Sequence, residues 1–257
     1  MSNLNEQYVK DILERFHHDL LEQNLVKTKS VQSIDIDGDK VDHFVEQMNS
    51  NGHEIAGFSG DIADAATLDS LFRFMADTCS HPTGIVVNTA AVNRRQPALD
   101  VDAETYRWIM DVDLEMPFFV SQAAARAMRA RGTGGSIIHI SSTNARFGLQ
   151  STSIYAAAKA GLDQLARTLA VEWAPHGIRV NCIAPGFLMT DLSRPLWEDP
   201  SKESWIMGRV PLGRPGSPRE LIGACLLLAS QAGSFITGQT LTVDGGFLAG
   251  NSWAVDE

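Results

Sequence analysis

The fold of this chain is best predicted from two neighbouring segments, Ser136-Ile137-Ile138-His139-Ile140-Ser141-Ser142 and Tyr155-Ala156-Ala157-Ala158-Lys159. The first is a short apolar run behind the turn-forming residues 132–135, so it predicts a buried strand that ends in two serines. The second opens a segment rich in alanine and leucine, which predicts a helix to about Trp173. A strand followed by such a helix is the repeating unit of α/β folds.

Side chains with complementary chemistry stand on these two predicted elements. Tyr155 and Lys159 are four positions apart, which places them on one face of a helix. A free tyrosine, with a pKa of about 10, is a poor base at neutral pH, but a neighbouring ammonium favours its phenolate form. The hydroxyl of Ser142, at the end of the strand, can hold the reacting oxygen. These residues predict proton transfer to or from an alcohol or a ketone.

A Tyr-x-x-x-Lys pair alone occurs in many helices by chance. The order of glycine-rich turn, strand, two serines, tyrosine and lysine is more specific, and over roughly residues 31–250 it resembles the short-chain dehydrogenase/reductase family. The resemblance implies that Tyr155 is the general acid/base, Lys159 its electrostatic helper and ribose anchor, and Ser142 the group that holds the carbonyl oxygen. It also implies a single Rossmann-like domain over residues 1–257, with a substrate lid at 187–215.

Strand and helix patterns alternate along the rest of the chain. We expect strands at 31–36, 54–59, 84–88, 136–140, 178–183 and 240–243, and helices at 39–49, 67–80, 104–130, 155–173 and 218–230. This alternation predicts an α/β fold with a doubly wound, mostly parallel sheet and helices on both faces.

Local matches to the family imply where a dinucleotide would lie. Asp35 ends a predicted strand, where an acidic residue pairs with the adenosine ribose hydroxyls and repels a 2′-phosphate, so NAD is expected in preference to NADP. The other cofactor contacts that the resemblance implies are Ile36, Asp61, Ile62, Asn88, Ala90, Tyr155, Lys159, Pro185, Gly186, Leu188 and Thr190. Structural interpretations stay open for several of them, such as a turn at Asp35, a helix cap at Asp61 and a strand-end turn at Asn88.

The start of the chain departs from the family pattern. Family members begin with a strand and a glycine-rich turn, whose backbone lets the pyrophosphate approach a helix N-terminus. Here the first glycine is Gly38, and residues 5–25 predict an amphipathic helix. We therefore expect residues 1–30 to be atypical and the first strand to be missing or altered.

Asp113 is a second departure, because the family usually has an asparagine there. An aspartate could still accept hydrogen bonds from a relay water and from Lys159, so a catalytic relay role is expected. Its charge would raise the pKa of Tyr155. The alternative is a surface-facing Asp113 without a role.

The substrate is predicted from segments that resemble the branch containing gluconate 5-dehydrogenases and related sugar-acid or polyol oxidoreductases. Asn144 and Arg146 follow the catalytic serine, and Arg94 and Arg95 lie at the same edge of the predicted sheet. We expect Asn144, Arg146 and Arg94 to meet a carboxylate or hydroxyl groups; the alternative is solvated loop arginines. Three further side chains in the lid segment are substrate, subunit or core contacts: Trp197, Trp205 and Met207.

Composition excludes several classes of partner. The net charge is −10 and the isoelectric point about 5.1, which argues against nucleic acid and anionic membranes. Cys79, Cys182 and Cys225 lack paired-ligand spacing, so we expect free thiols in a reducing, cytoplasmic compartment and no metal site. No apolar run reaches the length of a membrane span. The resemblance implies a homotetramer, with contacts at 104–130, 155–173 and the C-terminal region.

Two classes of function remain. The first is an NAD(P)(H)-dependent oxidoreductase that interconverts a secondary alcohol and a ketone on a small polyhydroxy substrate, with a 3-oxoacyl-thioester reductase-like enzyme as a variant. The second is a scaffold that no longer binds dinucleotide and serves as a binding or assembly subunit. The absent glycine turn motivates this alternative, since each lost backbone hydrogen bond to a phosphate costs roughly 1.5–3 kcal/mol.

Overall fold

The structure is a computed structural model, and it describes residues 31–35, 38–50, 55–61, 64, 66–67, 70–71, 73–74, 84–190 and 192–250. The expected helix at 5–25, the atypical start at 1–30, Ile36 and Ile62 lie outside the described residues. Of the expected helix at 67–80, only a few positions are described.

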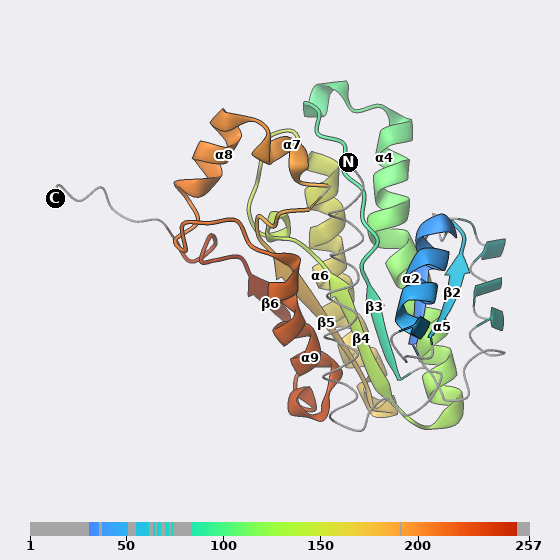
Figure 1. Cartoon of the computed structure of the whole chain (residues 1–257). Coiled ribbons are helices and arrows are strands. Elements are labelled where there is room, and N and C mark those ends of the chain that lie inside the picture. The colour runs from blue at the N-terminus through green and yellow to red at the C-terminus, as the bar shows by residue number, and fades with distance from the viewer. Residues whose placement is uncertain are drawn as a thin grey trace.

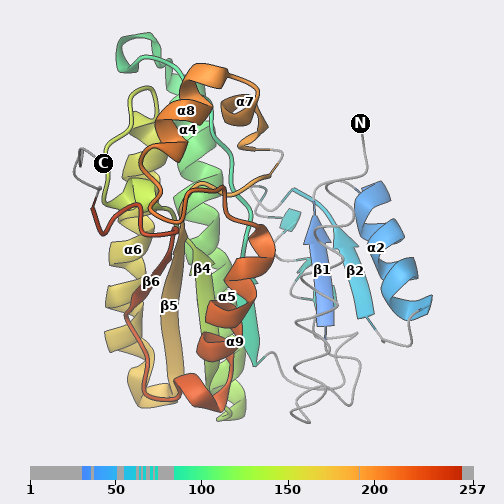
Figure 2. The ribbon, with the colours of Figure 1, turned by 60° about the vertical axis from the view of Figure 1, so that its left-hand side comes forward.

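Parallel strands form the centre of the described structure. Four of them, β3 (Ile85–Asn88), β4 (Gly135–Ile140), β5 (Ile178–Pro185) and β6 (Thr240–Val243), lie in the order β3-β4-β5-β6, and every neighbouring pair is parallel. A separate parallel pair joins β1 (Val31–Asp35) to β2 (Ile55–Ser59). Figure 1 and Figure 2 show this pair, with α2 (Gly38–Ser50), to one side of the four-stranded sheet. Within the described ranges no strand joins β1 to β3.

Helices cover both faces of the four-stranded sheet, as the alternating pattern predicted (Figure 2). One face packs against α5 (Met116–Arg131) and α6 (Ser153–Trp173), and the other packs against α9 (Ile222–Ala229). The remaining helical elements are η1 (Ala98–Asp100), α4 (Ala103–Met110), η2 (Asp111–Glu115), η3 (Thr143–Ala145), η4 (Ala174–His176), α7 (Arg194–Trp197), α8 (Pro200–Met207), η5 (Pro218–Leu221) and η6 (Gln231–Gly233).

Strand β4 is buried on both faces, which explains its continuous apolar sequence. Ile137 packs in the core under α5 and α6, whereas Ile138 packs in the core under α9, and both are 0 % exposed. Successive strand residues point to opposite faces, so neither face of a central parallel strand tolerates a charge. Burying each of these side chains contributes about 1.5–3 kcal/mol.

Two features of the described structure were not predicted. The segment 187–215 contains the short helices α7 and α8, and the junction between α4 and α5 is a π-helical turn, η2, at Asp111–Glu115. A π-helical turn inside an α-helix is frequent at functional sites. No helix in the described part of the chain combines the length and the apolar character that a membrane span requires.

Candidate active site

A cleft of about 1400 Å³ opens at the carboxyl ends of β3, β4 and β5. This is the edge at which open α/β sheets bind ligands. Strand ends supply Asn88, Ser141, Ser142 and Pro185 to its wall, and α6 supplies Tyr155 and Lys159. The two segments that predicted the fold therefore meet in one cavity.

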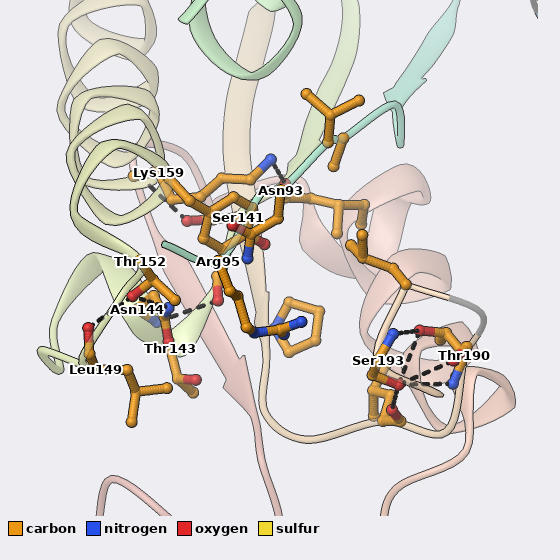
Figure 3. Close-up of a pocket in the computed structure, with 18 of the residues that line it drawn as sticks. Asn93, Arg95, Ser141, Thr143, Asn144, Leu149, Thr152, Lys159, Thr190 and Ser193 are labelled. Carbon is orange, nitrogen blue, oxygen red and sulfur yellow. Dashed lines mark hydrogen bonds between the residues drawn. The ribbon is translucent and has the colours of Figure 1, made fainter. Parts of the chain in front are cut away.

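Lys159 is held beneath the cleft by the end of β4. Its side chain is 1 % exposed, its Nζ donates a hydrogen bond to the Ile140 carbonyl oxygen at 3.1 Å, and its carbonyl accepts one from Ser141 Oγ at 3.4 Å. The ammonium lies 5.5 Å from the centroid of the Tyr155 ring. Burial lowers the pKa of Lys159, and the charge of Asp113 opposes that shift. Figure 3 shows the Lys159 side chain near Ser141.

Tyr155 shares a hydrogen bond with Ser142, so the two hydroxyl groups lie together. Burial and the charge of Asp113 raise the pKa of Tyr155 to about 12, while the Ser142 hydrogen bond and Arg95 act in the opposite direction. The tyrosine is therefore protonated at neutral pH in this structure. Ser142 also caps η3, where its Oγ accepts the Asn144 backbone N–H at 3.1 Å.

Asp113 is buried in the π-helical turn, so the surface-facing alternative is wrong. Its exposure is 0 %, and its Oδ1 accepts the Val92 backbone N–H at 2.9 Å. Its Oδ2 has no hydrogen-bond partner among the described residues. Burial raises the pKa of Asp113 to about 6, although Lys159 and the Val92 N–H both favour the charged form. Asp113 is thus coupled electrostatically to both Lys159 and Tyr155.

Except for Asp35, the expected cofactor positions that are described line this cleft. Its lining includes Asp61, Asn88, Ala90, Pro185, Gly186, Leu188 and Thr190. Asp35 ends β1 beside Ser59, which directly precedes the cleft residue Gly60. Gly186 is required by close packing, because a Cβ there would lie 2.6 Å from the Cβ of Asp244. Thr190 is fixed by Ser193, whose Oγ accepts the Thr190 backbone N–H at 2.9 Å.

The expected substrate residues separate into two groups. Asn144 lines the cleft and donates to Thr152 Oγ1 at 3.2 Å. The guanidinium groups of Arg94 and Arg146 are engaged away from its lining. Arg94 donates to Thr105 Oγ1 at 3.0 Å and lies over the Trp108 ring, whereas Arg146 pairs with Asp163 at 3.8 Å and donates to Thr242.

Arg95 is the arginine that lines the cleft, although sequence analysis singled out Arg94. It has no hydrogen bond or ion pair to any described residue, and its charge interacts with Tyr155. Figure 3 shows its guanidinium between the Asn144–Thr152 pair and the Thr190–Ser193 pair. Arg94 and Arg95 stand in the irregular segment that follows β3, where the residue that faces the cleft depends on the local backbone. The sequence alone did not tell which.

Aromatic side chains form the outer wall of the cleft. Phe147, Phe187 and Trp205 line it, and the Phe247 ring contacts the first two at centroid distances of 4.9 and 5.1 Å. Trp197 is a structural contact, since its Nε1 donates to Ser193 Oγ at 3.1 Å. Of the described residues, no group of three or more His, Cys, Asp or Glu is arranged to hold a metal ion.

The fold and the site define an α/β protein in which a tyrosine–lysine pair lines a cleft at the carboxyl edge of a parallel sheet. A family profile described as "Enoyl-(Acyl carrier protein) reductase" matches residues 28–248. The chain belongs to the short-chain dehydrogenase/reductase family, whose members are oxidoreductases that act on CH–OH groups.

Individual relatives act on sugars and sugar acids. The chain is 35 % identical to the 2-dehydro-3-deoxy-D-gluconate 5-dehydrogenase of Escherichia coli, over 80 % of this chain and 81 % of that protein. It is 41 % identical to the L-xylulose reductase of Bos taurus, over 65 % of this chain and 69 % of that protein. A gluconate 5-dehydrogenase from Burkholderia cenocepacia, solved with NADP and tartrate, superposes with a TM-score of 0.82 and 33 % identity over 86 % of each chain. Because that structure holds NADP, the comparisons do not support the expected preference for NAD.

Proposed function

We propose that the chain is an NAD(P)(H)-dependent oxidoreductase that interconverts a secondary alcohol and a ketone on a small sugar acid or polyol. One observation carries the proposal: Ser142, Tyr155, Lys159 and Arg95 line a single cleft, and Arg95 forms no ion pair within the described ranges. The sugar-acid and polyol dehydrogenases among the relatives support the substrate class.

Each catalytic side chain has a role that follows from its surroundings. The nicotinamide, when bound, exchanges a hydride with the carbon that bears the oxygen. Tyr155, protonated at neutral pH, donates its proton to the ketone oxygen, or accepts the alcohol proton in the reverse direction. Ser142 holds the same oxygen through its hydroxyl. The ammonium of Lys159 stabilises the phenolate that forms at Tyr155.

The charge of Asp113 raises the pKa of both Tyr155 and Lys159. Its unpaired Oδ2 can accept a hydrogen bond from a relay water, as the asparagine of relatives would be expected to do. As a carboxylate it also opposes formation of the Tyr155 phenolate. Asp113 therefore helps to keep Tyr155 protonated, the state in which the tyrosine can donate a proton to a ketone oxygen.

Arg95 gives the cleft a selective contact for a carboxylate. A guanidinium without a hydrogen-bond partner among the described residues can form a bidentate pair with a carboxylate, which is stronger than a neutral hydrogen bond. Asn144 supplies an amide on the same wall for a hydroxyl group. We therefore favour a sugar acid over an uncharged polyol, with α7, α8 and the rest of 187–215 acting as the lid.

The described part of the cleft fits a dinucleotide. Three segments supply lining residues: Gly60 and Asp61 after β2, Asn88 to Ala90 at the end of β3, and Pro185, Gly186 and Thr190 at and after the end of β5. We propose that either NAD or NADP occupies it, with Asp35 tending to favour NAD. A homotetramer is also proposed, because Tyr106, Phe119 and Val171 expose apolar surface on α4, α5 and α6.

Specific observations favour two alternatives. The family profile is described as an enoyl-(acyl carrier protein) reductase, which supports a substrate carried on a thioester, such as a 3-oxoacyl thioester. The absence of a glycine before Gly38 supports a scaffold that does not bind dinucleotide. A turnover screen of sugar acids, polyols and a 3-oxoacyl thioester with NADH and NADPH separates the proposed function from these two alternatives. Turnover of a sugar acid is expected; turnover of the thioester alone, or none in any combination, would contradict the proposal.

A further inference from the structure

A row of polar side chains crosses the four-stranded sheet beneath α5 and α6. The strand registers pair Asn88 with His139, His139 with Cys182, and Cys182 with Thr240. The sulfur of Cys182 approaches the Leu162 carbonyl of α6, and the amide of Asn88 reaches Ser121 of α5. Polar groups in a buried layer are expensive unless they are bonded, so this row calls for a functional explanation.

His139 is the least satisfied member of the row. It is 0 % exposed, and its Nδ1 lies 3.1 Å from the Asn88 Nδ2, while its Nε2 has no partner within the described ranges. Since Nδ2 is a donor, Nδ1 must accept, and the ring is neutral with its proton on Nε2. Burial, together with the charge of Lys159, lowers the pKa of His139 to about 3, which keeps the ring neutral.

Ser121 confirms the orientation of the Asn88 amide. Ser121 Oγ donates its proton to the Pro117 carbonyl at 2.6 Å, so towards Asn88 it can only accept. The atom of Asn88 that faces it, at 3.4 Å, is therefore the nitrogen Nδ2. Both amide protons of Asn88 are thus directed into the protein, one towards His139 and one towards Ser121.

The amide oxygen of Asn88 is left for a ligand. Asn88 lines the cleft, and its Oδ1 is bonded to no described residue and is not among the buried atoms that lack a partner. We propose that His139 is a positioning residue that fixes the Asn88 amide so that its oxygen, and not its nitrogen, faces the cleft. The wall between β3 and β4 then presents a hydrogen-bond acceptor, suited to a hydroxyl group of the ligand.

This inference rests on the proposed function only in the identity of that ligand, a ribose hydroxyl of the dinucleotide. A ring that donated from Nδ1 would instead pair with the Asn88 amide oxygen. The amide would then have to turn away from Ser121, and the cleft would present an N–H group, which cannot accept the proton of a ligand hydroxyl. His139 thus tunes recognition through Asn88 without touching substrate or cofactor.

Two substitutions of His139 separate positioning from packing. Asparagine places an amide oxygen near the position of Nδ1, so H139N keeps an acceptor for the Asn88 amide. Glutamine extends towards the position of Nε2, so H139Q removes that acceptor. We expect H139N to keep the Kd for NADH or NADPH within about twofold of wild type, and H139Q to raise it about tenfold, which corresponds to one ordered hydrogen bond. The kcat at saturating dinucleotide should change little in either variant. Equal losses of affinity in both variants would overturn the proposal.

A spectroscopic measurement decides the same point without any ligand. In the full chain labelled with ¹⁵N-histidine, the His139 signals are identified by their loss in H139N, and the ring nitrogen shifts report the tautomer. A neutral ring protonated on Nε2 at pH 7 is expected, and a ring protonated on Nδ1 would overturn the inference. Wild-type protein that shows the expected tautomer but binds no NADH or NADPH would contradict the proposed function and leave the role of His139 supported.

Discussion

Two regions of the molecule, residues 84–250 and residues 31–74, contribute unequally to the cleft. The first supplies Tyr155, Lys159, Ser142 and Arg95 on elements packed against a four-stranded sheet that is covered on both faces. The second is the β1–β2 pair with its neighbouring segments, and it contributes Gly60, Asp61 and Leu71. In the proposed function, chemistry and substrate contacts belong to the first region and the adenosine end of the dinucleotide to the second. Substitutions of the catalytic and substrate-binding residues in the first region should therefore change kcat or the KM for the substrate, whereas substitutions in the second should change the dissociation constant of the dinucleotide.

The largest effect is expected at Tyr155. Y155F removes the proton that the ketone oxygen receives, so kcat should fall roughly 10²–10⁴-fold, the contribution of a positioned general acid. Dinucleotide affinity should stay within about twofold of wild type, measured by fluorescence titration of NADH. Turnover that survives in Y155F would remove the tyrosine from its assigned role.

Asp113 should produce a pH-dependent change in stability. Its folded pKa of about 6 lies above the unfolded value of about 4, so the native state binds the extra proton. The contribution of this group to stability is therefore present below about pH 4, decreases as the pH rises to 6, and stays at the lower level above that pH. The difference is on the order of 2–3 kcal/mol.

D113N removes this titration, so its unfolding free energy should improve relative to wild type between pH 4 and pH 7. Urea unfolding of both proteins across that range measures the difference. A difference that does not vary with pH would show that Asp113 does not titrate in the folded protein.

Arg95 should separate charged from uncharged substrates. R95Q is expected to raise KM for a sugar acid about 10- to 100-fold, by loss of one charge-assisted pair, and to leave a polyol of similar size nearly unaffected. R94Q is the matched control, because the Arg94 side chain is engaged with Thr105 and Trp108. If R94Q weakens the sugar acid as much as R95Q does, the assignment of the carboxylate contact fails.

The smallest effect is expected in the two-stranded region. D35S removes a carboxylate at the end of β1, so the affinity for NADPH should rise relative to NADH by up to about tenfold. The rate of chemistry at saturating cofactor should not change. Measuring both dissociation constants tests this, and an unchanged ratio would remove Asp35 from the adenosine site.

The sequence predicted the secondary structure best where an apolar or alanine-rich pattern was continuous over a whole strand or helix. The apolar run that forms β4 and the alanine-rich segment that forms α6 were placed within two residues of their observed bounds, since burial on both strand faces and helix propensity leave strong local signals. The proposed catalytic residues Ser142, Tyr155 and Lys159 could be predicted from these two elements because they stand at fixed offsets on them or next to them.

Other features left no such signal. In the proposed lid, α7 is four residues long and α8 is eight, so both are shorter than the window of about 11 residues in which a helical apolar period can be recognised. The π-helical turn that buries Asp113 adds one residue to a helix without changing its composition. Arg95 and Arg94 stand in an irregular segment, where alternation cannot be assigned before the backbone is known. The role of His139 depends on the register of β3 against β4, a long-range property.

The central claim is that the cleft binds a dinucleotide although no glycine precedes Gly38 in the sequence. Calorimetric titration of the full chain with NADH and with NADPH tests it most directly. We expect micromolar affinity for at least one of them, abolished by neither R94Q nor Y155F. No binding of either at millimolar concentration would contradict the account, because the tyrosine–lysine centre would then have no hydride partner.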